Sequence, residues 1–503
     1  MKIMQVTVEV ARVEAASAEV LVLLHCEGEA LAKQDTARLD KALDGALSTL
    51  VHSKEFEGKA NEVLLYHTQD KVPAKRVVLV GLGKKNEVTT ETIRQAMGSA
   101  AKRVRQTKVE SFSVALPTVR PEGMSSLDVA QAMVEGAILG SYQFTVYRSE
   151  AASGRDVAEM RVLIPMKGQS RQVTEGIRRG VATAEATVFV RDLCNHPSNV
   201  LTPTRVADEA KAIAKADGIT INILEQKEME RLGMGALLGV ARGSQEPPKF
   251  IILEYNGAKK KDARPVVLVG KTITFDTGGI SLKPAENMEH MKADMTGGAE
   301  VLASIRAAAR LKLPLRLISI LPVAENMPGG RAMKPGDIVT TLSGKTVEVQ
   351  NTDAEGRLIL ADGLAYAMRY NPVALIDIAT LTGACVVALG QFAIGMFGTD
   401  DTLKERVRKA GQKSGERVWE MPLWEEYFEQ LKSDVADMRN IGGRGGGMIT
   451  AALFLSKFVG DCPWVHLDIA STDWSERERA YIPKGPTAIG TRLLVQYLID
   501  RSL

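Results

Sequence analysis

The sequence predicts an α/β protein of two domains: a smaller α/β domain at the N-terminus, and a C-terminal domain in which helices sandwich a mixed β-sheet. Three observations predict this. The chain has 503 residues, which is too long for one ordinary core. Strand-like and helix-like runs alternate over residues 1–168. From residue 195 onward, apolar β-branched runs alternate with helical segments, a pattern typical of a sheet covered by helices on both faces.

The N-terminal elements follow in chain order. The runs "VTVEVAR", "EVLVLL" and "RVVLVGLG" predict strands, and "TTETIRQAMGSAAKRVRQ" predicts a helix. A helical period then continues to His196-Pro197, where proline cannot extend a helix. We therefore expect an N-terminal domain over residues 1–168, a connecting helix over 169–194 and a C-terminal domain over 195–503.

The C-terminal elements are more strongly marked. Five runs predict buried strands: "FIILEYNG", "PVVLVGKTITFD", "LRLISILPVAEN", "VALIDIATLTG" and "WVHLDIAS". Three predict helices between them: "GGAEVLASIRAAARL", "GRLILADGLAYAMRY" and "MITAALFLSKFV".

The composition excludes several classes of protein. Hydrophobic residues make up 45% and charged residues 25%, as in soluble globular proteins. The 64 basic and 61 acidic residues leave a net charge of +3, which gives little reason to expect a general nucleic-acid or membrane binder. No signal peptide is recognisable, and the four cysteines form no CxxC pair, so we expect a cytoplasmic protein with reduced thiols and no membrane partner.

Most common catalytic motifs are absent. "VLVGKT" lacks the first glycine of a phosphate-binding loop, because that position is Pro265, and "VLVGLGKKN" has Asn86 where a dinucleotide fingerprint needs glycine. There is no G-x-S-x-G and no H-E-x-x-H. We expect structural roles for His196 and His466, and a structural or supporting role for His290. Any metal here should be held by carboxylates.

The stretch "QNTDAEGRLILADGLAYA" places Asp353, Glu355 and Arg357 just before an apolar helical run. Thr352 and Glu355 fit a capping box, in which the Thr side chain caps the helix and the Glu reaches back. In an extended approach to the helix, the two carboxylates would also point to one side. A cap and a binding site can therefore coexist here.

A second charged cluster lies in "VGKTITFDTGGISLKPAENMEHMKADMTGGAE". Lys271 and Asp276 follow a buried strand, where charged groups are costly unless they are paired or bound to a metal. Lys283 and Asp294 follow, and Asp294 stands just before another helix. Ligands of parallel sheets bind at the carboxyl ends of the strands, so we expect the two clusters to meet.

The four acids of these clusters would repel one another if they were not neutralised. Two divalent cations, bridged by carboxylates, would resolve this. The alternative treats each acid as a helix cap. It explains well one acidic cluster at the start of a helix. It explains poorly two such clusters that also carry Lys271, Lys283 and Arg357.

The segments "NTDAEGRLILADGL" and "VGKTITFDTGGISLKPAENMEHMKADMTGG" resemble the leucyl aminopeptidase family, the two-metal cytosolic aminopeptidases. The resemblance covers residues from about 195 to 503, and the overall length is similar to that of the bacterial members. It implies a catalytic metallopeptidase domain over 195–503, peptide substrates and a homohexamer.

The resemblance also implies a set of metal ligands. Lys271, Asp276, Asp294 and Glu355 would hold one ion; Asp276, Asp353 with its carbonyl oxygen, and Glu355 would hold the other. The ions would be Mn²⁺ or Zn²⁺. Because an amine binds a metal only when neutral, we expect a strongly lowered pKa for Lys271, from burial and from the adjacent dication.

The remaining roles implied by the resemblance concern catalysis and specificity. Lys283 would stabilise the developing oxyanion. Arg357 would hold a bicarbonate ion that shuttles the proton, although a salt bridge to a site carboxylate explains this arginine equally well. Met291, Thr380 and Gly383 would line a first side-chain pocket that suits Leu or Met; an ordinary core role for Met291 stays open.

A second possible function is DNA binding, since some bacterial relatives of the resembled family bind DNA as well as cleaving peptides. The sequence feature that could support it is the basic run "AKRVRQTK" at residues 101–108. A short basic run on a helix is also explained by an ordinary solvated face.

Overall fold

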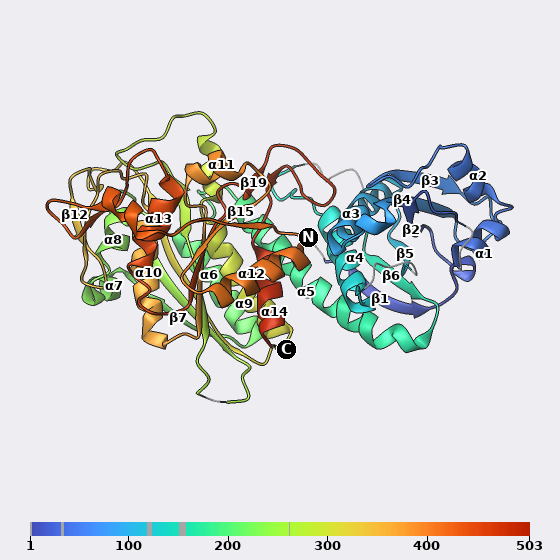
Figure 1. Cartoon of the computed structure of the whole chain (residues 1–503), viewed down its shortest axis with the longest axis horizontal. Coiled ribbons are helices and arrows are strands. Elements are labelled where there is room, and N and C mark those ends of the chain that lie inside the picture. The colour runs from blue at the N-terminus through green and yellow to red at the C-terminus, as the bar shows by residue number, and fades with distance from the viewer. Residues whose placement is uncertain (1–2, 32–34, 118–122, 150–156, 261, 503) are drawn as a thin grey trace. The chain divides into compact units, whose positions relative to one another are not determined.

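The computed structural model describes residues 3–31, 35–117, 123–149, 157–260 and 262–502 (Figure 1). The chain forms two compact units. One comprises Met1–Val188 with Glu476–Lys484, and the other comprises Phe189–Ser475 with Gly485–Leu503. Both units are α/β, and the N-terminal unit is the smaller, which confirms the predicted fold class. The domain limits expected after residues 168 and 194 stay a prediction.

The N-terminal unit is built on a six-stranded sheet in the order β1-β6-β5-β2-β4-β3. All neighbouring strands are parallel except β3 and β4. The strands are β1 (Gln5–Val10), β2 (Leu21–Glu27), β3 (Val63–His67), β4 (Arg76–Lys84), β5 (Ser111–Ala115) and β6 (Glu159–Ile164). The helices are α1 (Asp35–Ala42), α2 (Ala46–His52), α3 (Thr90–Gln106) and α4 (Ser126–Gly140), with the part of α5 (Ser170–Asn195) that ends at Val188.

Alternation along the central strands produces two cores in this unit. Val78 and Val80 of β4 pack in a cluster with α3, α4 and α5, whereas Val77 and Leu79 pack in a cluster with α1 and α2. Successive side chains of a strand point to opposite faces, so an unbroken apolar run such as "RVVLVGLG" is explained by a sheet that is buried on both sides.

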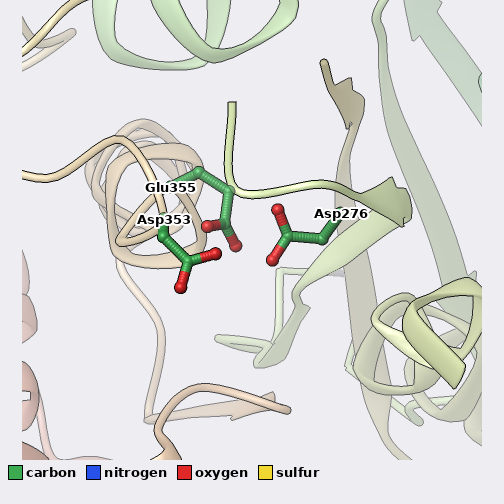
Figure 2. A group of neighbouring side chains, drawn as sticks. All are labelled: Asp276, Asp353 and Glu355. Carbon is green, nitrogen blue, oxygen red and sulfur yellow. The ribbon is translucent and has the colours of Figure 1, made fainter. Parts of the chain in front are cut away.

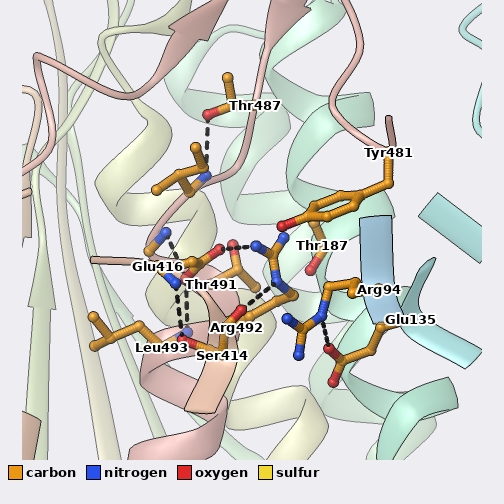
Figure 3. Close-up of polar contacts among 12 residues, drawn as sticks. Arg94, Glu135, Thr187, Ser414, Glu416, Tyr481, Thr487, Thr491, Arg492 and Leu493 are labelled. Atoms are coloured by element: carbon orange, nitrogen blue, oxygen red, sulfur yellow. Dashed lines mark hydrogen bonds and ion pairs between the residues drawn. The ribbon is translucent and has the colours of Figure 1, made fainter. Parts of the chain in front are cut away.

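An ion pair lies inside the larger of these two cores. Arg94 of α3 is 1% exposed, and its Nε donates to Glu135 Oε2 of α4 at 2.7 Å (Figure 3). Arg94 also pairs with Glu91, which accepts a hydrogen bond from Tyr481 at 2.8 Å. Tyr481 belongs to the late segment 476–484, so this network holds that segment within the N-terminal unit.

The second unit contains a nine-stranded mixed sheet in the order β16-β15-β18-β14-β9-β11-β8-β7, with β10 also paired to β11. Its strands are β7 (Thr220–Leu224), β8 (Lys249–Asn256), β9 (Val266–Gly270), β10 (Thr272–Asp276), β11 (Arg316–Asn326), β14 (Ala374–Ala379), β15 (Ile394–Gly398), β16 (Val418–Glu420) and β18 (Trp464–Asp468). Strands β18, β14, β9 and β11 are parallel and central, and the antiparallel strands lie toward the edges. The mixed sheet predicted for this unit is therefore confirmed.

Helices cover both faces of this sheet. Helices α9 and α14 contact each other on one face, and α10 packs with α8 and α13 on the other. The helices are α6 (Pro203–Asp217), α7 (Gln226–Leu232), α8 (Gly235–Ala241), α9 (Thr296–Arg310), α10 (Gly356–Ala367), α11 (Gly383–Leu389), α12 (Asp401–Ser414), α13 (Gly447–Ser456) and α14 (Thr491–Ser502). None of the helices in the described ranges combines the length and the apolar composition needed to cross a membrane.

Two small sheets complete the second unit. One contains β12 (Ile338–Thr340), β13 (Thr346–Glu348) and β17 (Met438–Arg439), and the other contains β19 (Trp474–Ser475) and β20 (Gly485–Pro486). The buried carboxylate of Glu416 accepts from the backbone N–H groups of Gly490 and Leu493 at the start of α14, and pairs with Arg492 (Figure 3). An anion at a helix N-terminus is stabilised by the unpaired N–H groups there.

The run "PVVLVGKTITFD" differs from its prediction as one strand. It forms two strands, β9 and β10, which are interrupted at Lys271. The N–H of Lys271 donates to Ile378 O of β14 at 3.1 Å, while β10 continues alongside β11 only. The interruption places Lys271 at the point where the pairing with β14 ends and the chain continues beside β11 alone.

Candidate metal centre

Asp276 is the last residue of β10 and opens a tight turn. Gly278 and Gly279 have φ angles of +85° and +66°, which side chains rarely adopt. A Cβ atom on Gly278 would lie 2.8 Å from Asp353 Oδ1, so the second acidic segment approaches this turn closely. Glycine is therefore required here both by the backbone conformation and by the space.

The capping box predicted for Thr352 and Glu355 does not form. Helix α10 begins directly after Glu355, and no side-chain hydrogen bond caps it. The hydroxyl of Thr352 instead donates to Gly278 O at 2.6 Å and accepts from the Ser281 N–H at 2.8 Å. Thr352 therefore joins the two acidic segments instead of capping α10.

The approach to α10 is also not extended, contrary to the prediction. Thr352 and Asp353 form a turn, and the Asp353 N–H donates to Asn351 Oδ1 at 2.8 Å. The carboxylates of Asp353 and Glu355 nevertheless lie on one side, since each has an oxygen close to Asp276.

Three carboxylates form the centre of the site. One oxygen each of Asp276, Asp353 and Glu355 lies within 4.8 Å of the others. Figure 2 shows these side chains facing one another, from the end of β10 and from the turn that leads into α10. The predicted meeting of the two distant segments is therefore present in the structure.

Asp294 reaches the same centre through Lys271. The Nζ atom of Lys271 lies 2.8 Å from Asp294 Oδ1 and 2.9 Å from Glu355 Oε1, and it donates to Thr380 O at 2.9 Å. Thr380 also donates its hydroxyl to Asp294 Oδ1 at 2.7 Å. The five expected ligand side chains thus form one contiguous polar group.

A second lysine contacts the other two carboxylates of the cluster. Lys283 Nζ lies 2.9 Å from Asp276 Oδ2 and 2.6 Å from Asp353 Oδ1. Its backbone N–H donates to Thr277 O at 2.9 Å, which closes the loop that follows the glycine turn. Lys283 remains partly accessible, since 23% of its side chain is exposed.

Two lysines do not balance four carboxylates. Burial and the neighbouring negative charges raise the pKa values of Asp294, Glu355 and Asp353 above their ordinary values. In addition, the buried oxygens Asp294 Oδ2 and Glu355 Oε2 accept no hydrogen bond from any described residue. Oxygen donors with excess negative charge are what divalent cations bind, so these residues fit a metal centre.

The lowered pKa expected for Lys271 is not found in the chain by itself. Burial alone lowers the pKa, but the carboxylates of Asp294, Glu355 and Asp276 together raise it above the ordinary value. The lowered pKa was expected with a dication bound beside Lys271, so it stays a prediction for the metal-loaded protein. A dication beside Lys271 would lower this pKa, because it disfavours the protonated amine.

Arg357 lies in the first turn of α10 and is buried. Its Nη1 donates to Asn440 O at 2.8 Å, and its Nε has no hydrogen bond within the described part of the chain. No ion pair between Arg357 and a site carboxylate is found among the described residues. Burial lowers the pKa of Arg357 to about 10, although Glu355 and Asp468 oppose this shift.

Two models of protein families match the chain. The catalytic domain of the cytosol aminopeptidase family matches residues 188–495, and the N-terminal domain of the same family matches residues 20–151. The chain belongs to the cytosol aminopeptidase family. The resemblance seen in the two acidic segments is thereby confirmed.

Relatives in the cytosol aminopeptidase family match over most of their length. A probable cytosol aminopeptidase of Geotalea uraniireducens is 50% identical, over 92% of each chain. One from Roseiflexus castenholzii is 47% identical, over 92% of this chain and 94% of the relative.

Solved structures of similar proteins share the fold. The bottromycin maturation enzyme BotP in complex with Mn has a TM-score of 0.85 and 36% identity, over 97% of this chain and all of that chain (100%). A mutant tomato leucine aminopeptidase has a TM-score of 0.88 and 34% identity, over 99% of this chain and 96% of that chain.

Membership of the cytosol aminopeptidase family establishes the general activity. The chain is a metal-dependent aminopeptidase, a hydrolase that acts on peptides. The family depends on a centre of two metal ions.

Two of the three expected specificity residues, Met291 and Thr380, lie beside Asp294. Met291 lies in a 3₁₀ helix (Met288–Ala293) that ends at Asp294, and Thr380 contacts Asp294 directly. Gly383 begins α11 and is exposed, with no atom within 4 Å of the position its Cβ would take. Space for a side chain is therefore present beside Gly383.

Other polar residues that support the centre were not expected from the sequence. Asn326, at the end of β11, donates through Nδ2 to Asp276 Oδ1 at 2.8 Å and to Thr352 O at 3.1 Å. Its position at a strand end was the signal that could have revealed it. Asn440 contacts both Arg357 and the turn before α10, and no comparable signal marks it.

His466 and His290 lie in surroundings that fit a structural role, and the role expected for His196 stays a prediction. His466 of β18 is fully buried, and its Nδ1 lies 2.6 Å from Asp377 Oδ1 of β14. The ring of His290 stacks on Trp474, with 4.0 Å between centroids. The four cysteines are buried and free.

Proposed function

We propose that this aminopeptidase removes N-terminal residues from peptides, with a preference for Leu- or Met-like side chains, by means of two divalent ions, Mn²⁺ or Zn²⁺. The observation that carries this proposal is the convergence of Asp276, Asp353 and Glu355, each with an oxygen within 4.8 Å of the others. The unsatisfied buried oxygens of Asp294 and Glu355 support it further.

The proposed ligands divide between two ions. Lys271, Asp276, Asp294 and Glu355 would hold one, and Asp276, Asp353 and Glu355 would hold the other, with the carbonyl oxygen of Asp353 assisting. Asp276 and Glu355 would serve both ions. When bound there, two divalent ions supply Lewis acidity and lower the pKa of water to near neutrality.

Lys283 would act on the substrate carbonyl. Its ammonium group is held at the centre by Asp276 and Asp353 and is still partly exposed. Burial lowers the pKa of Lys283, but Asp276 and Asp353 raise it by more, so this side chain is protonated at neutral pH. A fixed positive charge stabilises an oxygen that gains negative charge during hydrolysis.

Arg357 would hold a small planar oxyanion such as bicarbonate, which would carry the proton. The support is that Nη1 donates to Asn440 O, while the buried Nε has no hydrogen-bond acceptor among the described residues. A guanidinium offers parallel N–H donors that match such an anion.

The proposed specificity pocket contains Met291, Thr380 and Gly383. Thr380 is fixed against Asp294, so the pocket would lie beside the proposed ions. Gly383 leaves room for an apolar side chain. A Gly383→Leu variant should then raise KM for leucine p-nitroanilide more than for alanine p-nitroanilide.

Chelation followed by re-addition of metal tests the proposed function. Removing metals should abolish hydrolysis of leucine p-nitroanilide, and Mn²⁺ or Zn²⁺ should restore it. Asp294→Asn and Asp353→Asn should each weaken the binding of one ion about 10-fold or more. The control Asp337→Asn, a partly exposed carboxylate paired with Lys334, should bind as the wild type does. Failure of both metals to restore activity would contradict the proposal.

We also propose a homohexamer located in the cytoplasm. The word cytosol in the names of the relatives supports the location, and the hexamer rests on the family resemblance. Light scattering of the purified protein tests the assembly, and a monomer at micromolar concentration would contradict it.

The contacts of the basic run at residues 101–108 do not favour DNA binding. Lys102 pairs with Glu478, and Arg105 donates to Ser141 O at 3.4 Å. No observation therefore leads us to propose a second function.

A further inference from the structure

Asn440 is a buried residue that follows β17, the third strand of the small sheet. It has no exposed surface. Its backbone N–H donates to Glu348 O of β13 at 3.0 Å, which extends the β13–β17 pairing by one residue. This hydrogen bond therefore fixes the backbone position from which the side chain of Asn440 extends.

The side-chain amide of Asn440 holds the turn that carries Asp353. Its Oδ1 accepts from the N–H groups of Gln350 at 2.8 Å and Asn351 at 3.4 Å. Its Nδ2 donates to Asn351 O at 2.7 Å and to Ala354 O at 3.4 Å. These backbone groups lie on both sides of Asp353, so the amide fixes the path of the chain through that residue.

The backbone carbonyl of Asn440 holds a second part of the centre. It accepts a hydrogen bond from Arg357 Nη1 at 2.8 Å. A single residue therefore contacts the segment that bears Asp353 and the guanidinium of Arg357. Both groups would have to move if Asn440 moved.

We propose that Asn440 is a positioning residue that sets the Asp353 carboxylate and the Arg357 guanidinium relative to each other. This inference rests on the proposed function, because it assigns Asp353 to one of the two ions. Asn440 is not itself one of the proposed metal ligands.

The geometry requires an amide at this position. Only an amide presents an acceptor to the N–H groups of Gln350 and Asn351 and a donor to the carbonyl groups of Asn351 and Ala354. Aspartate has the same shape but would place an oxygen against those carbonyl groups. Alanine would leave all four backbone groups without this partner.

Calorimetric titration with Mn²⁺ alone, on the full-length metal-free protein, tests the proposal. The wild type should bind two ions. Asn440→Ala and Asn440→Asp should weaken one of the two binding steps about 10–100-fold, as loss of a group that orients a ligand does, and leave the other unchanged. If Asn440 had only a structural role, its substitution would lower thermal stability but would not weaken one Mn²⁺ binding step relative to the other.

Asp437→Ala is the matched control at the other end of the same strand pair. Asp437 accepts from the Thr346 N–H at 2.7 Å, three residues before Asn440 and at the end of the pairing that does not lead to the turn before α10. This variant should loosen the small sheet and leave both Mn²⁺ steps and kcat as in the wild type. Equal effects of Asp437→Ala and Asn440→Ala would overturn the proposal.

Hydrogen exchange on the wild type keeps the proposal testable if the Asn440 variants fail to fold. The amide hydrogens of Gln350 and Asn351 should exchange about 10-fold or more slowly than that of the exposed Glu286. Equally fast exchange would overturn the inference. So would two-step Mn²⁺ binding that is identical in Asn440→Ala and the wild type. A wild type that binds no Mn²⁺ would instead overturn the proposed function, and the inference with it.

Discussion

Thr352 and Gly278 are joined by a 2.6 Å hydrogen bond between the threonine hydroxyl and the glycine carbonyl oxygen. The two residues are 74 positions apart in the chain, and each lies in one of the two acidic segments. The same hydroxyl accepts from the Ser281 N–H. Thr352 thereby holds together two sets of carboxylates that repel each other.

Thr352→Val should destabilise the metal-free protein and reduce metal binding. Valine has nearly the same shape but neither donates to Gly278 O nor accepts from Ser281 N. Leaving these two polar groups, one buried and one partly buried, without a partner costs roughly 2–6 kcal/mol. The urea midpoint should fall, and Mn²⁺ affinity should fall with it. Thr341→Val removes a buried hydroxyl that bonds Lys345 O away from the centre, so it should lower the midpoint only.

Lys283→Met should reduce kcat for leucine p-nitroanilide about 10²–10³-fold, with KM changed much less. The reason is that the ammonium group is proposed to act on charge that develops only during the reaction. Lys334→Met, which removes an exposed lysine paired with Asp337, should have no effect on either constant. An effect of Lys283→Met confined to KM would mean that the lysine binds substrate without stabilising the reaction.

Asp362 should make stability depend on pH. Its carboxylate accepts from the N–H groups of Leu237 at 2.9 Å and Leu342 at 2.7 Å, but burial dominates and raises its pKa to about 7. Between the ordinary value of 3.8 and about 7, the folded form keeps a proton that the unfolded form has released. Raising the pH through this window therefore destabilises the fold, by up to about 4 kcal/mol.

The comparison of wild type with Asp362→Asn isolates this effect. Asparagine does not titrate, so the stability of the wild type relative to the variant should decrease from about pH 4 to about pH 7 and then level off. Urea unfolding at fixed pH values measures this difference. A difference that stays constant across the window would show that Asp362 titrates normally in the folded protein.

Arg94→Met should destabilise the N-terminal unit without changing catalysis by the protein that remains folded. It leaves the carboxylate of Glu135, which is 1% exposed, buried without its cation. Breaking a buried pair in this way costs about 3–5 kcal/mol. Adding Glu135→Gln should recover part of the loss, because the second change removes the unpaired charge. Thermal unfolding and kcat of the three proteins check this, and a double variant no more stable than Arg94→Met would contradict it.

The sequence by itself determined the central strands of the larger sheet, three strands of the smaller one, and the acids that converge between the two acidic segments. Apolar runs such as Val266–Gly270 form strands because a sheet covered on both faces buries every side chain of the run. Asp276 could be chosen because it ends such a strand, and charged groups at that place need a partner or a metal. These inferences depend only on periodicity and on the side chains themselves.

Only the tertiary structure decided how the two acidic segments are held. The capping box at Thr352 was a sound local prediction, but its hydroxyl binds Gly278 instead. Asn440, 83 residues beyond Arg357, fixes both that arginine and the turn before α10. Hydrogen bonds between residues so far apart in the chain leave no periodic pattern in the sequence. Which of these hydrogen bonds form depends on which backbone groups come within reach once the sheets have formed.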